Sequence, residues 1–237
     1  MSTLEFSNST LAFLNVQDRP SPLSDIVDGP LPSGRHSLTR EAVLASQRGR
    51  LLDAMAEAVA EHSYGATTIA HVVSHAGVSR KTFYEHFRDK EHCFLAMYDT
   101  GIAFVLGRLT ESLETADDPR ERLVAGVRTF LTVLAEEPAF CRAIVLEVYA
   151  AGPTGRAKRR AVLQVFAGRY LEVNRQAREA DPDIAPLSGD VALAVVGAIL
   201  ELVSTRVEEG RTDELAALTD SLADFVIRSV LPSKPCP

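Results

Sequence analysis

The residues best suited to chemistry lie together in the stretch AGVSRKTFYEHF, residues 76–87. If Val78, Phe83 and Phe87 face inward on a short helix, its other positions present cations, hydroxyls, a phenol and an imidazole to solvent. These outward positions are Ser79, Arg80, Lys81, Thr82, Tyr84, Glu85 and His86. Arginine and lysine pair with guanine edges, while hydroxyl groups bind phosphates or bases. The stretch therefore predicts a helix that lies against double-stranded DNA.

A helix of this kind needs a partner helix and a tight turn to hold it in place. The preceding residues supply both, since Ile69, Val72, Val73 and Ala76 can face inward from a first helix and Gly77 permits a sharp reversal. The sequence thus predicts a helix-turn-helix over residues 68–87, with Ser79 capping the second helix. The alternative is three packed helices whose outer face is merely solvated.

Two residues outside the second helix are also placed for phosphate. Thr68 stands at the start of the first helix, and Lys90 lies just inside the start of the next long helix. A cation at a helix N-terminus opposes the helix dipole at a cost of ~0.3–1 kcal/mol. A bound phosphate would reverse that sign, because it would attract both the helix amides and Lys90.

The charge distribution supports a local DNA-binding patch. The chain has a net charge of −7, whereas residues 67–90 contain four cations and two acidic residues, a net charge of +2, which leaves −9 for the other 213 residues. An acidic body would repel DNA everywhere except at this patch, and so would help to orient docking.

The stretch TIAHVVSHAGVSRKTFYEHF, followed by RDKE, resembles the DNA-binding motif of the TetR family of transcriptional regulators. The shared features are the threonine start, AGVS, the threonine before an aromatic pair, and a lysine that opens the next helix; Val73 stands where many members keep alanine. The resemblance is strong over about residues 45–105. It implies a homodimer that grips a near-palindromic operator and binds a small molecule in its bundle. It also implies phosphate contacts for Thr68, Tyr84 and Lys90, and base contacts for Arg80, Lys81 and Thr82.

The rest of the chain predicts an all-α fold of about nine helices, with no strand that could build a sheet. Its divisions are a flexible extension (1–38), a helix-turn-helix domain (39–90), a ligand-binding and dimerisation domain that begins with a long connecting helix (91–232), and a tail (233–237). The helix boundaries are marked by caps and prolines, of which Asp118 followed by Pro119 is the clearest.

Two C-terminal helices are candidates for the dimer interface. Residues 191–203, VALAVVGAILELV, are apolar almost all round, and small residues there permit close approach. The predicted interface residues are Ala194, Gly197, Ala198, Leu218, Leu222 and Phe225. Two helices from each subunit could form a four-helix bundle. The alternative is that both helices only close the core of the monomer.

An effector cavity needs an apolar lining with a few polar groups. The aromatic candidates are Phe104, Phe130, Phe140, Phe166 and Tyr170. Glu147 and Asn174 are the polar candidates, because each lies among apolar residues. The alternative for each of these residues is that it only packs in the core or lies on a solvated helix face. The sequence does not specify the effector.

Other kinds of site find little support. His71 and His75 have metal-ligand spacing, but no glutamate lies between them as in HExxH, so we expect neither metal nor cofactor. No nucleotide-binding or nucleophile motif points to an enzyme. The basic run GRAKRR, 155–160, is interpreted as a solvated face, with a second nucleic-acid site as the alternative. Three scattered cysteines and the absence of a signal peptide or long apolar run favour the cytoplasm and no membrane contact.

Together these features predict a ligand-responsive, DNA-binding transcriptional regulator, expected to be a repressor that a small molecule releases from its operator. The alternative is a helical small-molecule-binding or enzymatic domain whose helix-turn-helix no longer binds DNA.

Overall fold

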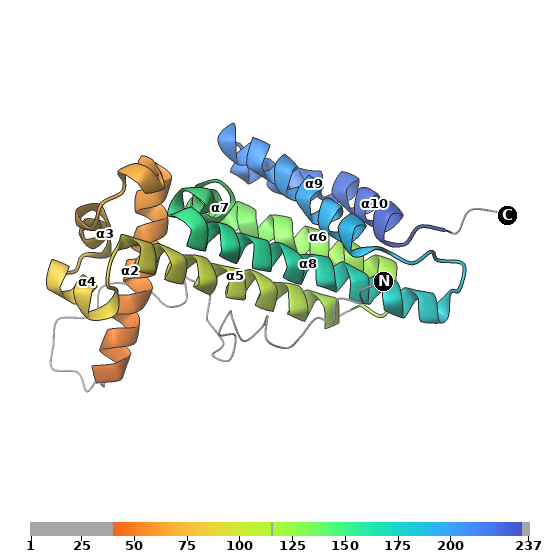
Figure 1. The fold of residues 1–237 in the computed structure, drawn as a ribbon, viewed down its shortest axis with the longest axis horizontal. Helices are drawn as coiled ribbons and strands as arrows, with labels where there is room; N and C mark the ends of the chain where they lie inside the picture. The colour runs from red at the N-terminus through yellow and green to blue at the C-terminus, as the bar shows by residue number, and fades with distance from the viewer. Residues whose placement is uncertain (1–39, 115, 234–237) are drawn as a thin grey trace.

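The computed structural model describes residues 40–114 and 116–233, and these form an all-α structure (Figure 1). The described part contains nine α-helices and two short 3-10 helices, which confirms the predicted fold class. Its only β-type pairing is an isolated bridge between Ile184 and Ser233. The predicted extension, residues 1–38, lies outside the described residues.

The N-terminal unit consists of α2 (Arg40–Ala66), α3 (Ile69–Ala76) and α4 (Arg80–His86). Val72 and Phe83 are buried in the same hydrophobic cluster as Leu51 and Met55 of α2, as their predicted inward-facing positions require. Gly77 adopts φ 61° and ψ 36°, and its amide donates to the last carbonyls of α3. A side chain at this backbone conformation would be strained, so glycine makes the tight turn possible.

Helix α2 is kinked near its end. Ser63 has φ 64° and ψ 160°, and it is the one described residue other than glycine with positive φ. Helix α2 continues to Ala66 beyond this kink. The last turn of α2 is therefore offset from the rest of the helix, close to the start of α3.

Helix α5 (Lys90–Glu114) connects the N-terminal unit to the bundle (Figure 1). Its residues 90–113 are long and apolar enough to cross a membrane by length and composition alone, with 56% of the most apolar window buried inside the fold. Tyr98, Phe94 and Met97 are almost fully buried. The apolar character of α5 is thus that of a core helix.

The remaining helices form the bundle. They are α6 (Pro119–Glu136), α7 (Pro138–Val145), η2 (Glu147–Ala151), α8 (Gly152–Ala180), α9 (Gly189–Glu208), η3 (Thr212–Leu218) and α10 (Thr219–Val230). Asp118 caps α6 and Pro119 opens it, as predicted. Helices α5, α6 and α8 run along the length of the molecule, while α9 and α10 cover one side of them (Figure 1). Helix α2 packs against α7 and η2, so these two elements meet the N-terminal unit.

Candidate nucleic-acid interface and ligand cavity

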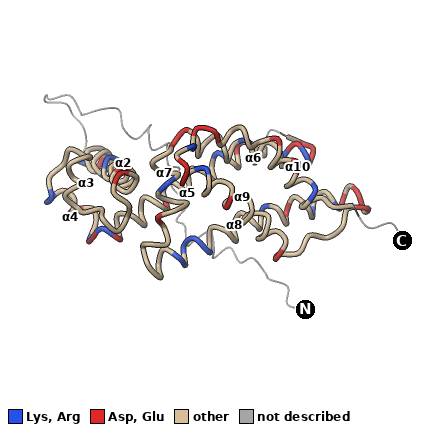
Figure 2. The backbone as a smooth tube through the Cα atoms, turned by 90° about the horizontal axis from the view of Figure 1, so that it is seen from above, with Lys and Arg blue, Asp and Glu red and all other residues tan. Residues whose placement is uncertain are grey.

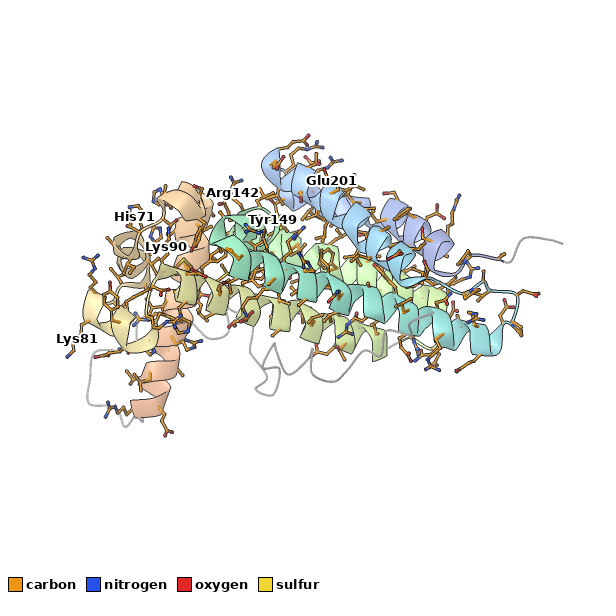
Figure 3. All side chains as sticks on the ribbon, viewed as in Figure 1. His71, Lys81, Lys90, Arg142, Tyr149 and Glu201 are labelled. Atoms are coloured by element: carbon orange, nitrogen blue, oxygen red, sulfur yellow. The ribbon has the colours of Figure 1, made fainter. Side chains whose placement is uncertain are left out.

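The face of α4 that points away from the core carries the predicted DNA-reading residues. Arg80, Lys81 and Tyr84 are exposed, Tyr84 by 54%. Lys81 points outward from the end of the molecule opposite the bundle (Figure 3), and its ammonium lies 4.0 Å from Glu85. Such an exposed pair contributes little to stability. Arg80 and Lys81 are therefore accessible to a ligand as large as DNA.

Ser79 and Thr82 order the first turn of this helix. The Ser79 hydroxyl accepts from the Thr82 amide at 3.0 Å and lies 2.9 Å from the Thr82 hydroxyl. Ser79 thus caps α4, as predicted. Both hydroxyls remain at the outward end of the helix, where recognition helices meet base edges.

His86 faces α2 more than solvent. Its Nε2 lies 3.5 Å from the Gln47 side-chain oxygen. Burial, and then the charge of Arg48, lower the pKa of His86. The imidazole is therefore held more in the neutral form, which makes it a weaker phosphate ligand than an exposed histidine.

Thr68 has the predicted position at the start of α3. Its hydroxyl accepts from the His71 amide at 3.3 Å, and His71 Nδ1 accepts from the Thr68 amide at 3.4 Å. This reciprocal pair is a capping box built with histidine in place of glutamate. Thr68 is exposed, so its hydroxyl stays open to a further acceptor such as phosphate.

Lys90 has partners that the sequence reasoning missed. Its ammonium donates to the carbonyls of Tyr64 at 2.7 Å, Thr67 at 2.9 Å and Gly65 at 3.4 Å, and it lies 4.4 Å from the centre of the Tyr64 ring. A cation at these carbonyls complements the negative end of α2. Lys90 therefore joins α5 to the end of α2, and its predicted phosphate contact would compete with these bonds.

The histidine pair of α3 is engaged within the protein. His75 Nδ1 lies 3.0 Å from the His71 carbonyl, and His75 Nε2 lies 3.4 Å from Glu61. The hydrogen bond to that carbonyl, followed by Glu61, raises the pKa of His75. Within residues 40–114 and 116–233, no three metal-ligating side chains gather into a site.

A cavity lies inside the bundle between α5, α6, α7, α8 and α9. It offers about 90 Å³ to the centres of water molecules, and its walls are mostly apolar. The residues that α5 contributes run from Tyr98 to Leu113, a length of roughly 22 Å at the helical rise of about 1.5 Å per residue. Gly126 opens the wall on α6. The cavity is thus elongated along the bundle.

Three of the seven predicted lining residues border this cavity, namely Phe130, Phe166 and Tyr170. The other four do not. Phe140 packs so closely on Gly101 that a Cβ there would lie 1.8 Å from its ring, and Phe104 lies near Arg108. Glu147 faces α2 instead of the cavity, because its carboxylate accepts from the Tyr64 amide at 2.9 Å.

Asn174, the other predicted polar residue, is a structural crosslink. Its amide donates to the carbonyls of Ala185 at 3.0 Å and Val230 at 2.7 Å, and its oxygen accepts from the Leu187 amide at 3.1 Å. The whole side-chain amide is thus occupied, and it ties α8 to the chain before α9 and to the end of α10.

Arginines supply the polar groups of the cavity, and the sequence reasoning missed them. Arg122 donates to Gln176 at 2.7 Å, and Arg159 donates from Nε to the Tyr149 hydroxyl at 2.7 Å. Arg169 donates to Thr110 at 3.0 Å, but its Nε is buried with no hydrogen-bond partner in residues 40–114 and 116–233. Burial lowers the pKa of Arg169. An anionic group would satisfy this guanidinium.

One face of α9 is left uncovered by the described residues of the monomer. Ala194, Gly197 and Ala198 are exposed, and a Cβ added at Gly197 would meet nothing within 4 Å. Val191, Leu193 and Leu202 are 40–46% exposed, and Phe225 of α10 is 39% exposed. Leu218 is half-buried, whereas Leu222 is only 3% exposed, because it faces the monomer core. Leu222 is thus the one predicted interface residue that the monomer already buries.

The basic run 155–160 follows the expected solvated-face pattern in part. Arg156 and Arg160 are exposed, whereas Lys158 forms an ion pair with Asp99 at 2.6 Å. Figure 2 shows that basic residues also occur along the bundle, separated from those at the outer end of α4.

Comparison with known proteins matches residues 51–97 to the family described as bacterial regulatory proteins, tetR family. The transcriptional activator FasR of Mycolicibacterium smegmatis is 27% identical over 122 residues, which cover 52% of this chain and 56% of that protein. The transcriptional repressor Rv1474c of Mycobacterium tuberculosis is 26% identical over 203 residues, covering 78% and 96%. The structure of FadR from Bacillus subtilis in complex with stearoyl-CoA has a TM-score of 0.69 at 19% identity, covering 76% and 97%. This last likeness shows a shared fold.

Proposed function

Because the chain belongs to the TetR family of transcriptional regulators, we propose that it acts in the cytoplasm as a homodimeric repressor that a small molecule releases from a near-palindromic operator. The observation that carries the proposal is the exposed cationic and hydroxylic face of α4, the second helix of a helix-turn-helix. Arg80 and Lys81 would contact bases together with Thr82, while Thr68 and Tyr84 would hold phosphates.

The exposed α9 face supports the dimer. Small residues at Ala194, Gly197 and Ala198 would let the α9 helices of two subunits approach closely, with Phe225 at the edge. Two recognition helices would then reach successive major grooves, about 34–36 Å apart.

The cavity supports an effector with a long apolar part and a negative charge. Its elongated apolar walls suit an alkyl chain, and both Arg159 and Arg169 line it as donors for an anionic group, the buried Nε of Arg169 having no partner among the described residues. A fatty acyl thioester has both features, and a protein of the same fold binds stearoyl-CoA. Binding would favour a dimer whose recognition helices no longer match the operator; a coupling of ~1–3 kcal/mol would weaken DNA binding ~5–150-fold.

The first test is selection of bound fragments from random duplex DNA, followed by titration at several salt concentrations. We expect a pseudo-palindrome and a steep salt dependence. Arg80→Ala combined with Lys81→Ala should abolish specific binding, whereas Arg156→Ala with Arg160→Ala, the same charge change on exposed α8 positions, should preserve it. If both pairs bind alike, the assignment of α4 is wrong. If the folded dimer binds no DNA, the chain is a helical ligand-binding or enzymatic domain.

The effector is tested with acyl-CoA probes of increasing chain length, by thermal shift and by release of the selected DNA. Gly126→Leu would fill the cavity and should abolish both effects. Gly107→Leu places the same side chain in open space on α5 and should preserve them. Equal responses in both variants would place the effector outside this cavity.

A further inference from the structure

The kink in α2 is held in place by the bundle. Ser63 has φ 64° and ψ 160°, a region that is essentially reserved for glycine, and such strain persists only where surrounding contacts enforce it. The amide of the next residue, Tyr64, donates a hydrogen bond to Glu147 Oε2 at 2.9 Å. Glu147 is half-buried and belongs to η2, not to the N-terminal unit. A carboxylate from the bundle therefore binds the strained backbone of α2.

This contact lies close to the DNA-reading helices. The Tyr64 carbonyl accepts from Lys90, which also binds the Thr67 carbonyl. Thr67 directly precedes Thr68, the cap of α3. A change in the position of Tyr64 can thus be transmitted to the start of α3 by two routes: through Lys90 of α5, and through backbone residues 65–67.

The same 3-10 helix also contacts a residue that lines the cavity. Arg159 lines the cavity, donates from Nε to the Tyr149 hydroxyl at 2.7 Å, and places its guanidinium 4.9 Å from the centre of the Tyr149 ring. Gly155 packs so closely on η2 that a Cβ there would lie 2.3 Å from the Val148 carbonyl oxygen. The start of α8 and η2 must therefore shift together. Tyr149 and Lys90 both lie near the boundary between the two parts of the molecule (Figure 3).

We propose that Glu147 acts as a latch on the strained kink of α2, and that an anionic effector releases this latch by drawing Arg159 away from Tyr149. A hydrogen bond from a guanidinium to an anion is stronger than one to a neutral phenol, so an anionic group in the cavity competes for Arg159. Once Tyr149 is free, η2 shifts, Glu147 leaves the Tyr64 amide, and Ser63 relaxes. The end of α2 and the start of α3 then move relative to the bundle. The effector step rests on the proposed function; the latch itself does not.

Hydrogen exchange of the full-length protein, without DNA or effector, tests the latch. In Glu147→Ala the amides of residues 63–77 should exchange about tenfold faster, as expected for loss of a charge-assisted hydrogen bond. Amides of α9 should be unaffected. Glu111→Ala, which removes an exposed carboxylate of α5, should resemble the wild type. If Glu147→Ala fails to fold, Glu147→Gln is used, with a smaller increase expected.

A second substitution separates a latch from an ordinary contact. Glycine adopts the Ser63 conformation without strain, so Ser63→Gly added to Glu147→Ala should return exchange at residues 63–77 toward the wild-type rate. Unchanged exchange in Glu147→Ala, or no recovery in the double variant, would overturn the latch.

Tyr149→Phe tests the link to the cavity, since it removes the hydroxyl that Arg159 binds while keeping the ring. Exchange at residues 63–77 should rise, and stearoyl-CoA should raise it in the wild type but add little in Tyr149→Phe. Wild-type exchange in Tyr149→Phe would refute the link. If stearoyl-CoA fails to bind the wild type, the proposed effector class is wrong, while the ligand-free results still decide the latch.

Discussion

Replacing Asp53 by asparagine should change how the stability of the protein depends on pH. Asp53 lies on α2, and its Oδ1 is buried without a hydrogen-bond partner among the described residues. Burial, followed by the charges of Glu137 and Glu57, raises the pKa of Asp53 to about 7. The carboxyl group is thus protonated more readily in the folded protein than in the unfolded chain.

The direction and the size of the effect follow from linkage. Between pH 3.8, the ordinary pKa of the side chain, and about 7, the folded state binds more protons than the unfolded state at this position. Stability therefore falls as pH rises through this window, and it is flat with respect to Asp53 above and below it. At about 1.4 kcal/mol per pKa unit the upper limit is ~4 kcal/mol. Because the side chain keeps contact with solvent, screening reduces the expected effect to about 1–2 kcal/mol.

Urea unfolding of the wild type and Asp53→Asn at intervals from pH 4 to pH 8 measures this directly. The stability of the variant relative to the wild type should increase by about 1–2 kcal/mol from pH 4 to pH 8, because asparagine cannot ionise. Glu111→Gln, which removes an exposed carboxylate, should give a profile parallel to that of the wild type. Parallel profiles for Asp53→Asn as well would refute the burial and repulsion assigned to Asp53.

Four further substitutions test packing and polar contacts by urea unfolding. Gly101→Ala would place a Cβ 1.8 Å from the Phe140 ring and should lower the free energy of unfolding by ~1–3 kcal/mol or more. Gly107→Ala adds a methyl group in open space and should raise it by about 0.5–1 kcal/mol. Equal effects of the two substitutions would contradict the close packing at Gly101. Asn174→Ala should cost about 2–3 kcal/mol, because it leaves buried backbone groups unpaired; a loss under ~0.5 kcal/mol would refute the crosslink. Lys90→Met should lower the free energy of unfolding by about 1–2 kcal/mol, because it leaves backbone carbonyls without their donor. An unchanged urea midpoint would show that the Lys90 hydrogen bonds contribute nothing to stability.

The helix-turn-helix could be predicted because its signals are local. Gly77 is required by a positive φ, Ser79 and Thr68 cap the helices that follow them, and inward positions at helical spacing fill one small core. Each feature depends on residues only a few positions apart. Sequence spacing therefore carries almost all of the information needed for this part of the fold.

The cavity could be predicted only in part, because its walls come from five helices that are distant in sequence. Phe130 and Phe166 were found by their size, whereas Phe140 is of the same type and packs on Gly101 instead. Glu147 and Asn174 stood out as polar residues among apolar ones, yet both bind backbone groups far along the chain. Nothing in the local sequence states which distant amide or carbonyl a buried polar side chain will meet.

The partners of Lys90 could not be predicted from the local sequence either. Its place at a helix N-terminus indicated a missing anion. The structure instead supplies carbonyls at and just after the end of α2, which are partial negative charges of the protein itself. The electrostatic reasoning was sound, but the partner was not identifiable, since the approach of α5 to the end of α2 is a tertiary feature.

The junction between α2 and the bundle combines apolar packing with polar contacts whose net contribution is small. Asp53 is destabilised when it ionises, and Glu147 and Lys90 bind backbone groups beside a strained serine. A junction made only of apolar side chains would have fewer such costs and would hold one orientation more firmly. Polar contacts at a strained kink instead let a modest change in one partner shift the balance between two arrangements. On the proposed function, in which a ligand shifts the recognition helix through a coupling of only ~1–3 kcal/mol, a junction of this kind would make that shift possible.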